Sequence, residues 1–202
     1  MLALLLLLFA GYADQLGVMP DARLLADLRS EVTGKLAPLL ADTFTGGATA
    51  LGAEADQAAV KWAKAYADEL AAAITDNTRE RLLAARQAEQ QGYHDEAEEI
   101  RRGAFAPVRA EAISITETTR ADTMGQRYGA HRLGQQGQPM TAFWVAEQDG
   151  KVCPICQKMD GQPEDLWEYL EPELGAGPPG HPRCRCRIRW EAVGKPQELQ
   201  TA

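Results

Sequence analysis

Between residues 21 and 133, apolar residues recur at intervals of three and four, which is the spacing of one face of an α-helix. The segment 54–74 shows this best, with Trp62, Tyr66 and Leu70 on one face and charged residues elsewhere. We expect this face to pack in a core. Helical spacing also predicts helices over residues 21–36 and 107–133, whereas capping signals predict one over 77–91 and an acidic first turn predicts one over 95–105.

Several local signals divide these predicted helices. Pro38 removes a backbone donor and is expected to break or kink the first helix, and the glycine pair at 46–47 is expected to end the segment. Asn77, followed three residues later by Glu80, resembles a capping box, so a new helix is predicted to start there. Gly92 is the expected stop of that helix.

The first twelve residues are almost entirely apolar, with leucine at positions 2 and 4–8. This stretch is too short to span a bilayer as a helix, and it lacks the positive residues that open a secretory signal. We therefore expect a buried helix, or the remainder of a longer chain, rather than a signal peptide. No membrane partner is expected.

A period of two appears in the last third of the chain. Residues 141–146 alternate as a half-buried strand does, and Asp149-Gly150 is a hairpin-turn signal. A returning strand is therefore predicted to lead through Val152 to Cys153.

These patterns predict an α+β protein that is mainly α. A helical region covers residues 1–134, and a small zinc-stabilised β lobe, built from a hairpin and a later strand, covers 135–193. Inside the lobe, a short helix is predicted over 164–170 and an irregular segment, rich in glycine and proline, over 175–182. The polar residues 194–202 are predicted to be a loose tail.

All four cysteines occur in two close pairs, Cys153 with Cys156 and Cys184 with Cys186. Two thiolate pairs joined by a loop supply the soft ligands that tetrahedral zinc requires. We predict one structural Zn²⁺ held by these four cysteines. A second ligand set replaces Cys186 by His181. Disulfides are a further alternative, although disulfide-rich secreted domains are usually smaller and contain more cysteine.

The later cysteine pair lies in a second alternating run, over residues 183–190. In a strand, successive side chains point to opposite faces, so Cys184 and Cys186 would share the inward face with Ile188. The other face would carry Arg183, Arg185, Arg187 and Arg189. This arginine row predicts a basic contact face for phosphates, for an acidic protein surface or for the acidic residues nearby.

The helix predicted over 107–133 places Glu117 and Arg120 among apolar residues, one turn apart. A buried ion pair costs desolvation unless hydrogen bonds compensate it. We predict a structural polar pair in which Glu117 is buried and accepts hydrogen bonds from Arg120 or from the backbone of the lobe. An exposed ion pair and a catalytic carboxylate are the alternatives.

Composition limits the function further. A hydrophobic content of 45% is sufficient for a core, and a formal net charge of −8 argues against a general coat on nucleic acid. The sequence contains no phosphate loop, nucleophile elbow or metal-hydrolase helix motif. We therefore predict a protein that is not an enzyme.

Several motifs follow one another in order within residues 59–188. They are Ala112-Ile113-Ser114-Ile115-Thr116-Glu117 with Arg120-Ala121, then Trp144, Cys153-Pro154-Ile155-Cys156 and Asp160-Gly161, and last Pro178-Pro179-Gly180-His181-Pro182-Arg183-Cys184-Arg185-Cys186. In this order they resemble the Mu-F-like family of tailed-phage minor head, or head morphogenesis, proteins.

The resemblance implies a minor capsid protein, of a phage or a prophage, that acts in prohead assembly near the portal or in DNA packaging and delivery. Its expected partners are the portal protein and the capsid and scaffold proteins. Its expected location is the virion and, during assembly, the host cytoplasm. The family implies no established catalytic activity.

Two other functions fit the cysteine pairs. A zinc-dependent enzyme, such as a nuclease or a toxin-linked module, would need an open coordination position and a general base. A nucleic-acid-binding zinc module would use the arginine row, and only weak contact with DNA is expected from an acidic chain.

Overall fold

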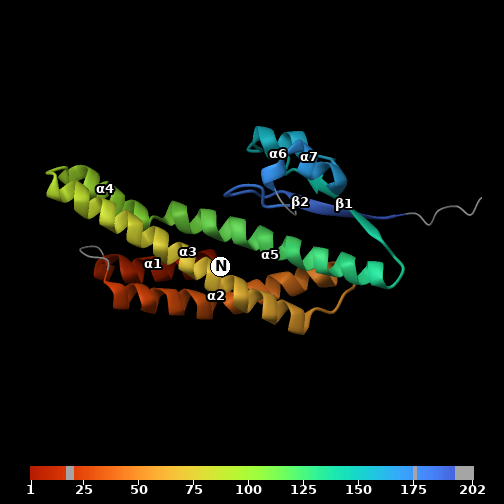
Figure 1. The fold of residues 1–202 in the computed structure, drawn as a ribbon, viewed down its shortest axis with the longest axis horizontal. Helices are drawn as coiled ribbons and strands as arrows, with labels where there is room; N and C mark the ends of the chain where they lie inside the picture. Colours follow the sequence, from red (N-terminus) through yellow and green to blue (C-terminus); the bar gives the residue numbers. More distant parts are fainter. Residues whose placement is uncertain (17–20, 175–176, 194–202) are drawn as a thin grey trace, which may run out of the picture.

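The computed structural model describes residues 1–16, 21–174 and 177–193 of the chain. Its larger part is a helical bundle. In chain order the helices are α1 (Leu2–Leu16), α2 (Ala22–Ala50), α3 (Asp56–Gln90), α4 (His94–Ala104) and α5 (Pro107–Gln135). Helix α2 packs against both α3 and α5, α1 packs against α2 and α5, and α4 folds back along the end of α3 (Figure 1).

The apolar first residues of the chain form part of the bundle core. Leu5, Leu8 and Phe9 of α1 are buried, and they belong to the same core as the fully buried Leu36 and Leu40 of α2. The expected buried helix is therefore confirmed. Within the part of the chain that the structure describes, no helix has the length and apolar character that crossing a membrane requires.

Helix α2 continues past both positions at which the sequence predicted a break. Pro38 lies inside the helix on its exposed side, where the carbonyl that it leaves unpaired, that of Gly34, can be hydrated. The glycine pair at 46–47 is helical too. A Cβ at Gly47 would lie 2.4 Å from the carbonyl oxygen of Asp122 in α5. The predicted helix end was wrong because the close approach of α5, not a chain reversal, requires glycine here.

A single helix, α3, replaces the two helices that were predicted over 54–74 and 77–91. Asn77 is not a cap. Its Oδ1 accepts a hydrogen bond from Arg81 Nε, one turn further along the same helix, at 3.0 Å. The capping-box prediction was therefore wrong, whereas Gly92, at φ 85°, follows the end of the helix as expected.

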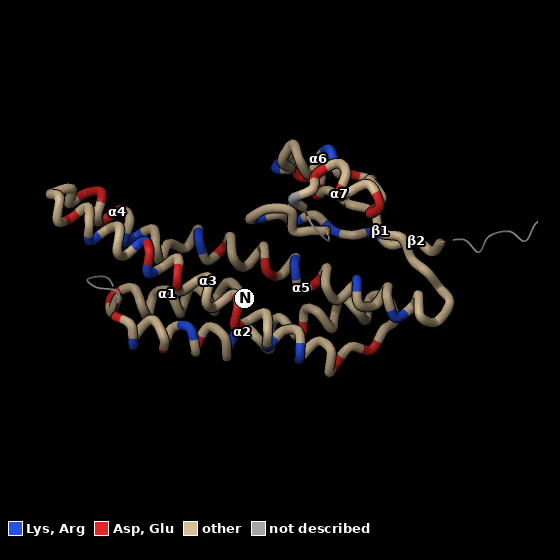
Figure 2. Tube along the Cα trace, in the orientation of Figure 1, with Lys and Arg blue, Asp and Glu red and all other residues tan. Residues whose placement is uncertain are grey.

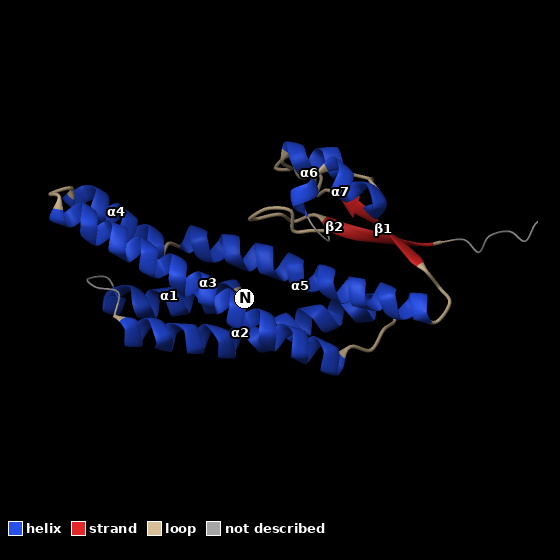
Figure 3. Ribbon diagram, viewed as in Figure 1, coloured by secondary structure: helices blue, strands red, loops and turns tan. Residues whose placement is uncertain are grey.

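The remaining elements form a small lobe beside α5, on the side of that helix away from α2 (Figure 1). They are β1 (Met140–Val145), α6 (Pro154–Met159), the 3₁₀ turn η1 (Glu164–Leu166), α7 (Trp167–Leu170), the 3₁₀ turn η2 (Pro172–Leu174) and β2 (Arg187–Ala192). The strands make a two-stranded antiparallel sheet, in which Trp144 lies opposite Ile188 (Figure 3). The protein is thus mainly helical with one small sheet, and that part of the predicted fold class is confirmed.

The partner of β1 is not the strand that the sequence predicted. Asp149 and Gly150 form a bend, in which Lys151 N–H donates to Asp149 Oδ1 at 3.0 Å, and the chain then enters α6. Strand β2, which comes much later in the chain, pairs with β1 instead. Because β2 begins at Arg187, only the second half of the strand predicted over 183–190 forms.

The other predictions for the lobe concern its connections. The short helix expected over 164–170 is confirmed as η1 and α7, and residues 177–182 are irregular as expected. The tail predicted over 194–202 lies outside the described residues. Charged residues of both signs are interspersed along α3, α4 and α5 (Figure 2).

Candidate metal centre

The first cysteine pair is placed by the start of α6. Cys153 is the N-cap residue and Pro154 takes the first helical position, which suits its fixed φ. The Cys156 N–H donates to Cys153 Sγ at 3.3 Å, so both sulfurs lie at the same end of the helix. Cys-x-x-Cys at a helix start also occurs in redox proteins, but those proteins have a parallel βαβ unit, whereas this sheet is antiparallel.

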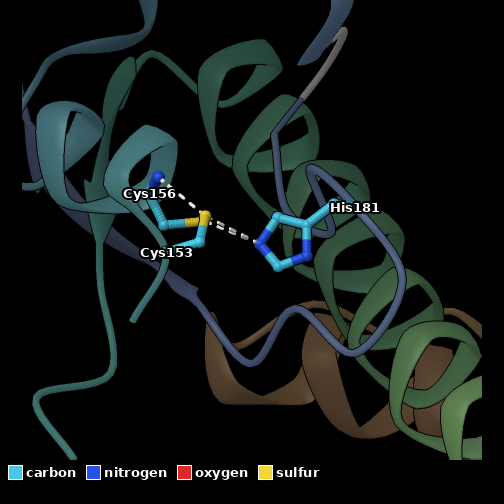
Figure 4. Close-up of side chains that lie close together, drawn as sticks. All are labelled: Cys153, Cys156 and His181. Atoms are coloured by element: carbon cyan, nitrogen blue, oxygen red, sulfur yellow. Dashed lines mark hydrogen bonds between the residues drawn. The ribbon is translucent and has the colours of Figure 1, made fainter. Parts of the chain in front are cut away.

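His181 approaches this pair from the irregular segment that crosses α5. Its Nε2 lies 3.1 Å from Cys153 Sγ and 3.2 Å from Cys156 Sγ (Figure 4). Its other ring nitrogen, Nδ1, lies 2.8 Å from the carbonyl oxygen of Pro182. A carbonyl can only accept, so Nδ1 carries the proton, and in the neutral ring Nε2 presents a lone pair to the two sulfurs. Histidine ligands of metals are commonly oriented in this way.

The second cysteine pair lies beside the first. Cys184 Sγ is 3.8 Å from Cys156 Sγ, and two thiolates on one tetrahedral zinc lie about 3.8 Å apart. The two distances from His181 are shorter than the about 3.6 Å expected around zinc. A bound ion would therefore move the imidazole outward by a few tenths of an ångström. Cys156, Cys184 and Cys186 are all buried.

The five donor atoms form two overlapping groups, in each of which every donor lies within 4.8 Å of the others. One group is Cys153, Cys156 and His181, and the other is Cys156, Cys184 and Cys186. A cavity of about 20 Å³ touches all five residues. This volume admits about one water-sized occupant, as a single metal ion would be. All four cysteines are free thiols, so the disulfide alternative finds no support.

The thiols influence one another electrostatically. Hydrogen bonds with Cys156 and Cys186 lower the pKa of Cys184 well below its ordinary value, and hydrogen bonding with Cys184 raises the pKa of Cys156. Cys156 lowers the pKa of Cys186, but Cys184 and burial raise it more, so that its pKa lies above the ordinary value. The cluster therefore favours one thiolate over several, and a divalent cation would remove that restriction.

Trp144 supplies a second observation that fits a metal ion beside the cysteines. Its side chain is fully buried, and its Nε1 makes no hydrogen bond of good geometry with any described residue. The acceptor that this N–H approaches is the sulfur of Cys186, an interaction that favours the thiolate. A buried donor without a partner is costly. A metal that kept the cluster deprotonated would give this donor a better acceptor, so the residues present fit a metal ion.

Two threonines of α5 hold the chain beside the donors. Thr116 Oγ1 accepts from Arg183 N at 2.9 Å, and Thr119 Oγ1 donates to the carbonyl oxygen of Cys184 at 3.0 Å. Arg183 has a φ of 64°, a region that residues other than glycine rarely adopt. Its guanidinium also donates to Glu111 of α5, at 3.0 Å. We call Thr116 and Thr119 the threonine clamp, and sequence reasoning missed it.

The arginine row is present, but its charges are compensated locally. The pairs are Arg183 with Glu111, Arg185 with Asp149, Arg187 with Glu147 and Arg189 with Glu191. The guanidinium of Arg189 also lies over the ring of Phe143, 4.7 Å from its centre. Burial alternates as predicted, with the arginines exposed and Cys184, Cys186 and Ile188 buried.

Glu117 lies at the joint between the lobe and the bundle. It is 7% exposed and accepts from Tyr66 Oη of α3 at 2.5 Å and from Arg120 Nε at 3.3 Å. Burial, followed by the hydrogen bond to Glu117, raises the pKa of Tyr66 above its ordinary value, so the phenol stays a donor. Glu117 is thus bonded to the bundle and to Arg120, and the threonine clamp, not Glu117, bonds to the backbone of the lobe. The partner Tyr66 was not predicted.

Together these features define a class of protein, a helical scaffold whose small lobe is built around a cluster of cysteine and histidine side chains that could hold a metal ion. The family model described as Phage Mu protein F like protein matches residues 52–189, more than half of the chain. The chain therefore belongs to this family, which confirms the resemblance carried by the ordered motifs. No curated protein and no solved structure matches it. The matched segment runs from just before α3 into β2, so it covers α3 to α5 and all five candidate ligands.

Proposed function

We propose that this protein is a non-enzymatic minor component of a phage head, which joins the portal region to the inside of the forming prohead. The observation that carries the proposal is the extent of the family match. It spans residues 52–189, which include helices α3 to α5 and every candidate metal ligand. The family supports a role in head morphogenesis, and with it an association with other head proteins and with the virion. The place beside the portal is part of our proposal.

One zinc ion, with a structural role, is part of this proposal. The geometry favours the set of Cys153, Cys156, His181 and Cys184, because His181 presents Nε2 to the first pair and Cys184 lies at a tetrahedral spacing from Cys156. In this set Cys186 stays beside the ligands as the acceptor for the indole of Trp144. The four-cysteine set stays the competing prediction.

Several features argue for a structural ion rather than a catalytic one. A catalytic zinc keeps one open position and has a general base nearby. Here five donors surround a cavity of about 20 Å³. The carboxylates that line it, Glu147 and Asp149, are in ion pairs with Arg187 and Arg185. Hydrogen bonds from Lys151 N–H and Arg185 lower the pKa of Asp149, so it is a poor proton acceptor.

Direct DNA binding has less support than docking on protein. Each arginine of the row already has a carboxylate partner, and the chain carries a net charge of −8. Phosphate binding would have to break those pairs, and it would work against the overall charge.

Co-expression with the portal, scaffold and major capsid proteins of the same phage tests this role. We expect affinity capture of the protein to bring down the portal, and electron microscopy to find it inside proheads at the portal vertex. Cys156→Ser should reduce that capture, whereas the exposed Thr118→Val should not. No association with portal or prohead, together with metal-dependent cleavage of DNA that Glu117→Gln abolishes, would replace this proposal by the enzyme.

A further inference from the structure

The joint between α5 and the lobe contains a second cleft, which shares only His181 with the candidate ligands of the metal centre. It encloses about 510 Å³ and lies between one face of α5 and the segment 177–182. Pockets for small ligands usually have volumes of 300–1,000 Å³ in this measure. Its walls are mixed, with Met124, Leu174 and three prolines on the apolar side and Arg120, Glu117 and Thr123 among the polar side chains.

Arg120 is the only lysine or arginine among the described residues that line this cleft. Its Nε donates to Glu117, its guanidinium lies 5.8 Å from the centre of the Tyr66 ring, and 40% of its side chain is exposed. The terminal nitrogens of the guanidinium have no hydrogen-bond partner among the residues that the structure describes. The contact through Nε therefore fixes the orientation of the group and leaves its outer edge available.

Glu117 contacts this guanidinium only through Nε. The same oxygen, Oε2, accepts a shorter hydrogen bond from Tyr66, at 2.5 Å, than from Arg120, at 3.3 Å. A guanidinium with an available edge is suited to a planar anion, which it binds through two parallel hydrogen bonds. The cleft therefore offers one oriented cation beside an apolar wall.

We propose that this cleft binds the C-terminal carboxylate of a partner protein whose last residue is apolar. A terminal residue carries a carboxylate and a side chain on the same carbon, so it can reach Arg120 and the wall of Met124 and Leu174 together. An acidic side chain in the middle of a partner would be flanked by backbone carbonyls that need donors. The prolines of this wall have no N–H and cannot supply them. A nucleic acid fits less well, because it would bring many phosphates to a chain with a net charge of −8, and no second lysine or arginine lines the cleft among the described residues.

The test uses the zinc-loaded full chain and small peptides as probes. The peptides are acetyl-Ala-Leu with a free carboxylate, the same peptide amidated, and acetyl-Glu-amide, and the fourth probe is inorganic phosphate. Binding is followed through the NMR signal of the Arg120 Nε–H and through the Met124 methyl group. We expect saturable shifts of both signals with the free-carboxylate peptide, and none with the amide.

Variants decide whether the cleft is responsible. Arg120→Gln should weaken binding of the free-carboxylate peptide about tenfold or more, and Arg120→Lys should restore part of it. Arg132→Gln, at an exposed position on the same helix, should leave binding unchanged. Equal binding of acetyl-Glu-amide or tighter binding of phosphate overturns the proposal, and so does the lack of any shift in the folded parent protein. The proposed role in head assembly is tested separately, because capture of the portal protein and peptide binding can fail independently.

Discussion

The helical bundle and the lobe are stabilised by different means. In the bundle, long helices bury rows of apolar side chains, so that Leu28, Val32, Leu36 and Leu40 of α2 are fully buried. The lobe has a core of ten buried residues, and three of these are cysteines. A core of that size rarely stabilises a unit by itself, and small folds commonly add a metal or disulfides.

Helix α5 belongs to both regions, and its two sides show the difference. Towards α2 it approaches so closely that Gly125 has no room for a side chain. Towards the lobe it makes specific hydrogen bonds, through the threonine clamp and through Gln126, whose Oε1 accepts from Trp190 Nε1 at 3.0 Å. Close apolar packing therefore defines one side of the helix, and polar contacts define the other.

Metal removal should have the largest effect, and it should separate the two regions. Structural zinc contributes on the order of 10 kcal/mol to the folding of small zinc modules. We expect chelation, or Cys156→Ser, to unfold the lobe and leave the bundle helical. Trp144, Trp167 and Trp190 lie in the lobe, so tryptophan fluorescence should change while far-UV circular dichroism changes little.

The control for this experiment is Trp62→Phe, which removes the tryptophan of the bundle. Native mass spectrometry of the reduced protein should find one zinc ion per chain. If the lobe stayed fully folded in metal-free protein, the claim that a metal stabilises the lobe while apolar packing stabilises the bundle would be wrong. His181→Ala and Cys186→Ser distinguish the ligand sets, because the mixed set predicts that the loss of His181 weakens zinc binding more.

The second prediction concerns the close approach of α2 and α5. A Cβ at Gly125 would lie 1.9 Å from the carbonyl oxygen of Phe44, so Gly125→Ala should lower the free energy of unfolding by about 3 kcal/mol. Gly34 is a matched control, because it is helical and exposed and no heavy atom lies within 4 Å of its added Cβ. Gly34→Ala should stabilise by about 0.5–1 kcal/mol. Urea unfolding followed by far-UV circular dichroism measures both, and effects of the same sign would refute the packing argument.

The third and smallest effect concerns the threonine clamp. Thr119→Val keeps a β-branched side chain but leaves the carbonyl of Cys184 without its donor, so the lobe should lose about 1 kcal/mol of stability. Thr118 is the exposed neighbour, and Thr118→Val should change stability by less than about 0.5 kcal/mol. Tryptophan fluorescence during urea unfolding of the zinc-loaded protein measures both variants. Equal losses for the two variants would show that the clamp does not hold the lobe.

The helices could be predicted because their signal is local. Apolar stretches and spacing, capping residues and charge located all five helices of the bundle, and the errors concern their continuity. Glycine usually ends a helix, but Gly47 lies inside α2 because α5 approaches it closely. Asparagine often starts a helix, but Asn77 lies inside α3, where its side chain accepts a hydrogen bond from Arg81. The strand pairing was wrong for a related reason. The turn signal at 149–150 is local, whereas the choice of β2 as partner depends on the whole lobe.

The candidate site shows the same limit. Cysteine spacing identified the donors, because ligand type and interval are visible in the sequence. The orientation of His181 and the unpaired N–H of Trp144 depend on the positions of the neighbouring atoms, which only the structure gives. Thr116 and Thr119 gave no signal beyond their place on one face of a helix, and their partners in the lobe are far away in the sequence.

The pairing of β1 with β2 has a consequence for the order in which the chain folds. The two strands lie at the two ends of the lobe's sequence, so the sheet forms only when a long loop closes. The chain loses the entropy of that loop before the strand contacts stabilise it. Consecutive helices of the bundle, such as α2 and α3, are joined by short connections and should pair first. In the proposed zinc site, ligation of Cys184 beside Cys153 and Cys156 would close most of that loop before the strands meet. The rate at which the lobe matures should therefore rise with the concentration of free zinc, while the rate for the bundle stays constant.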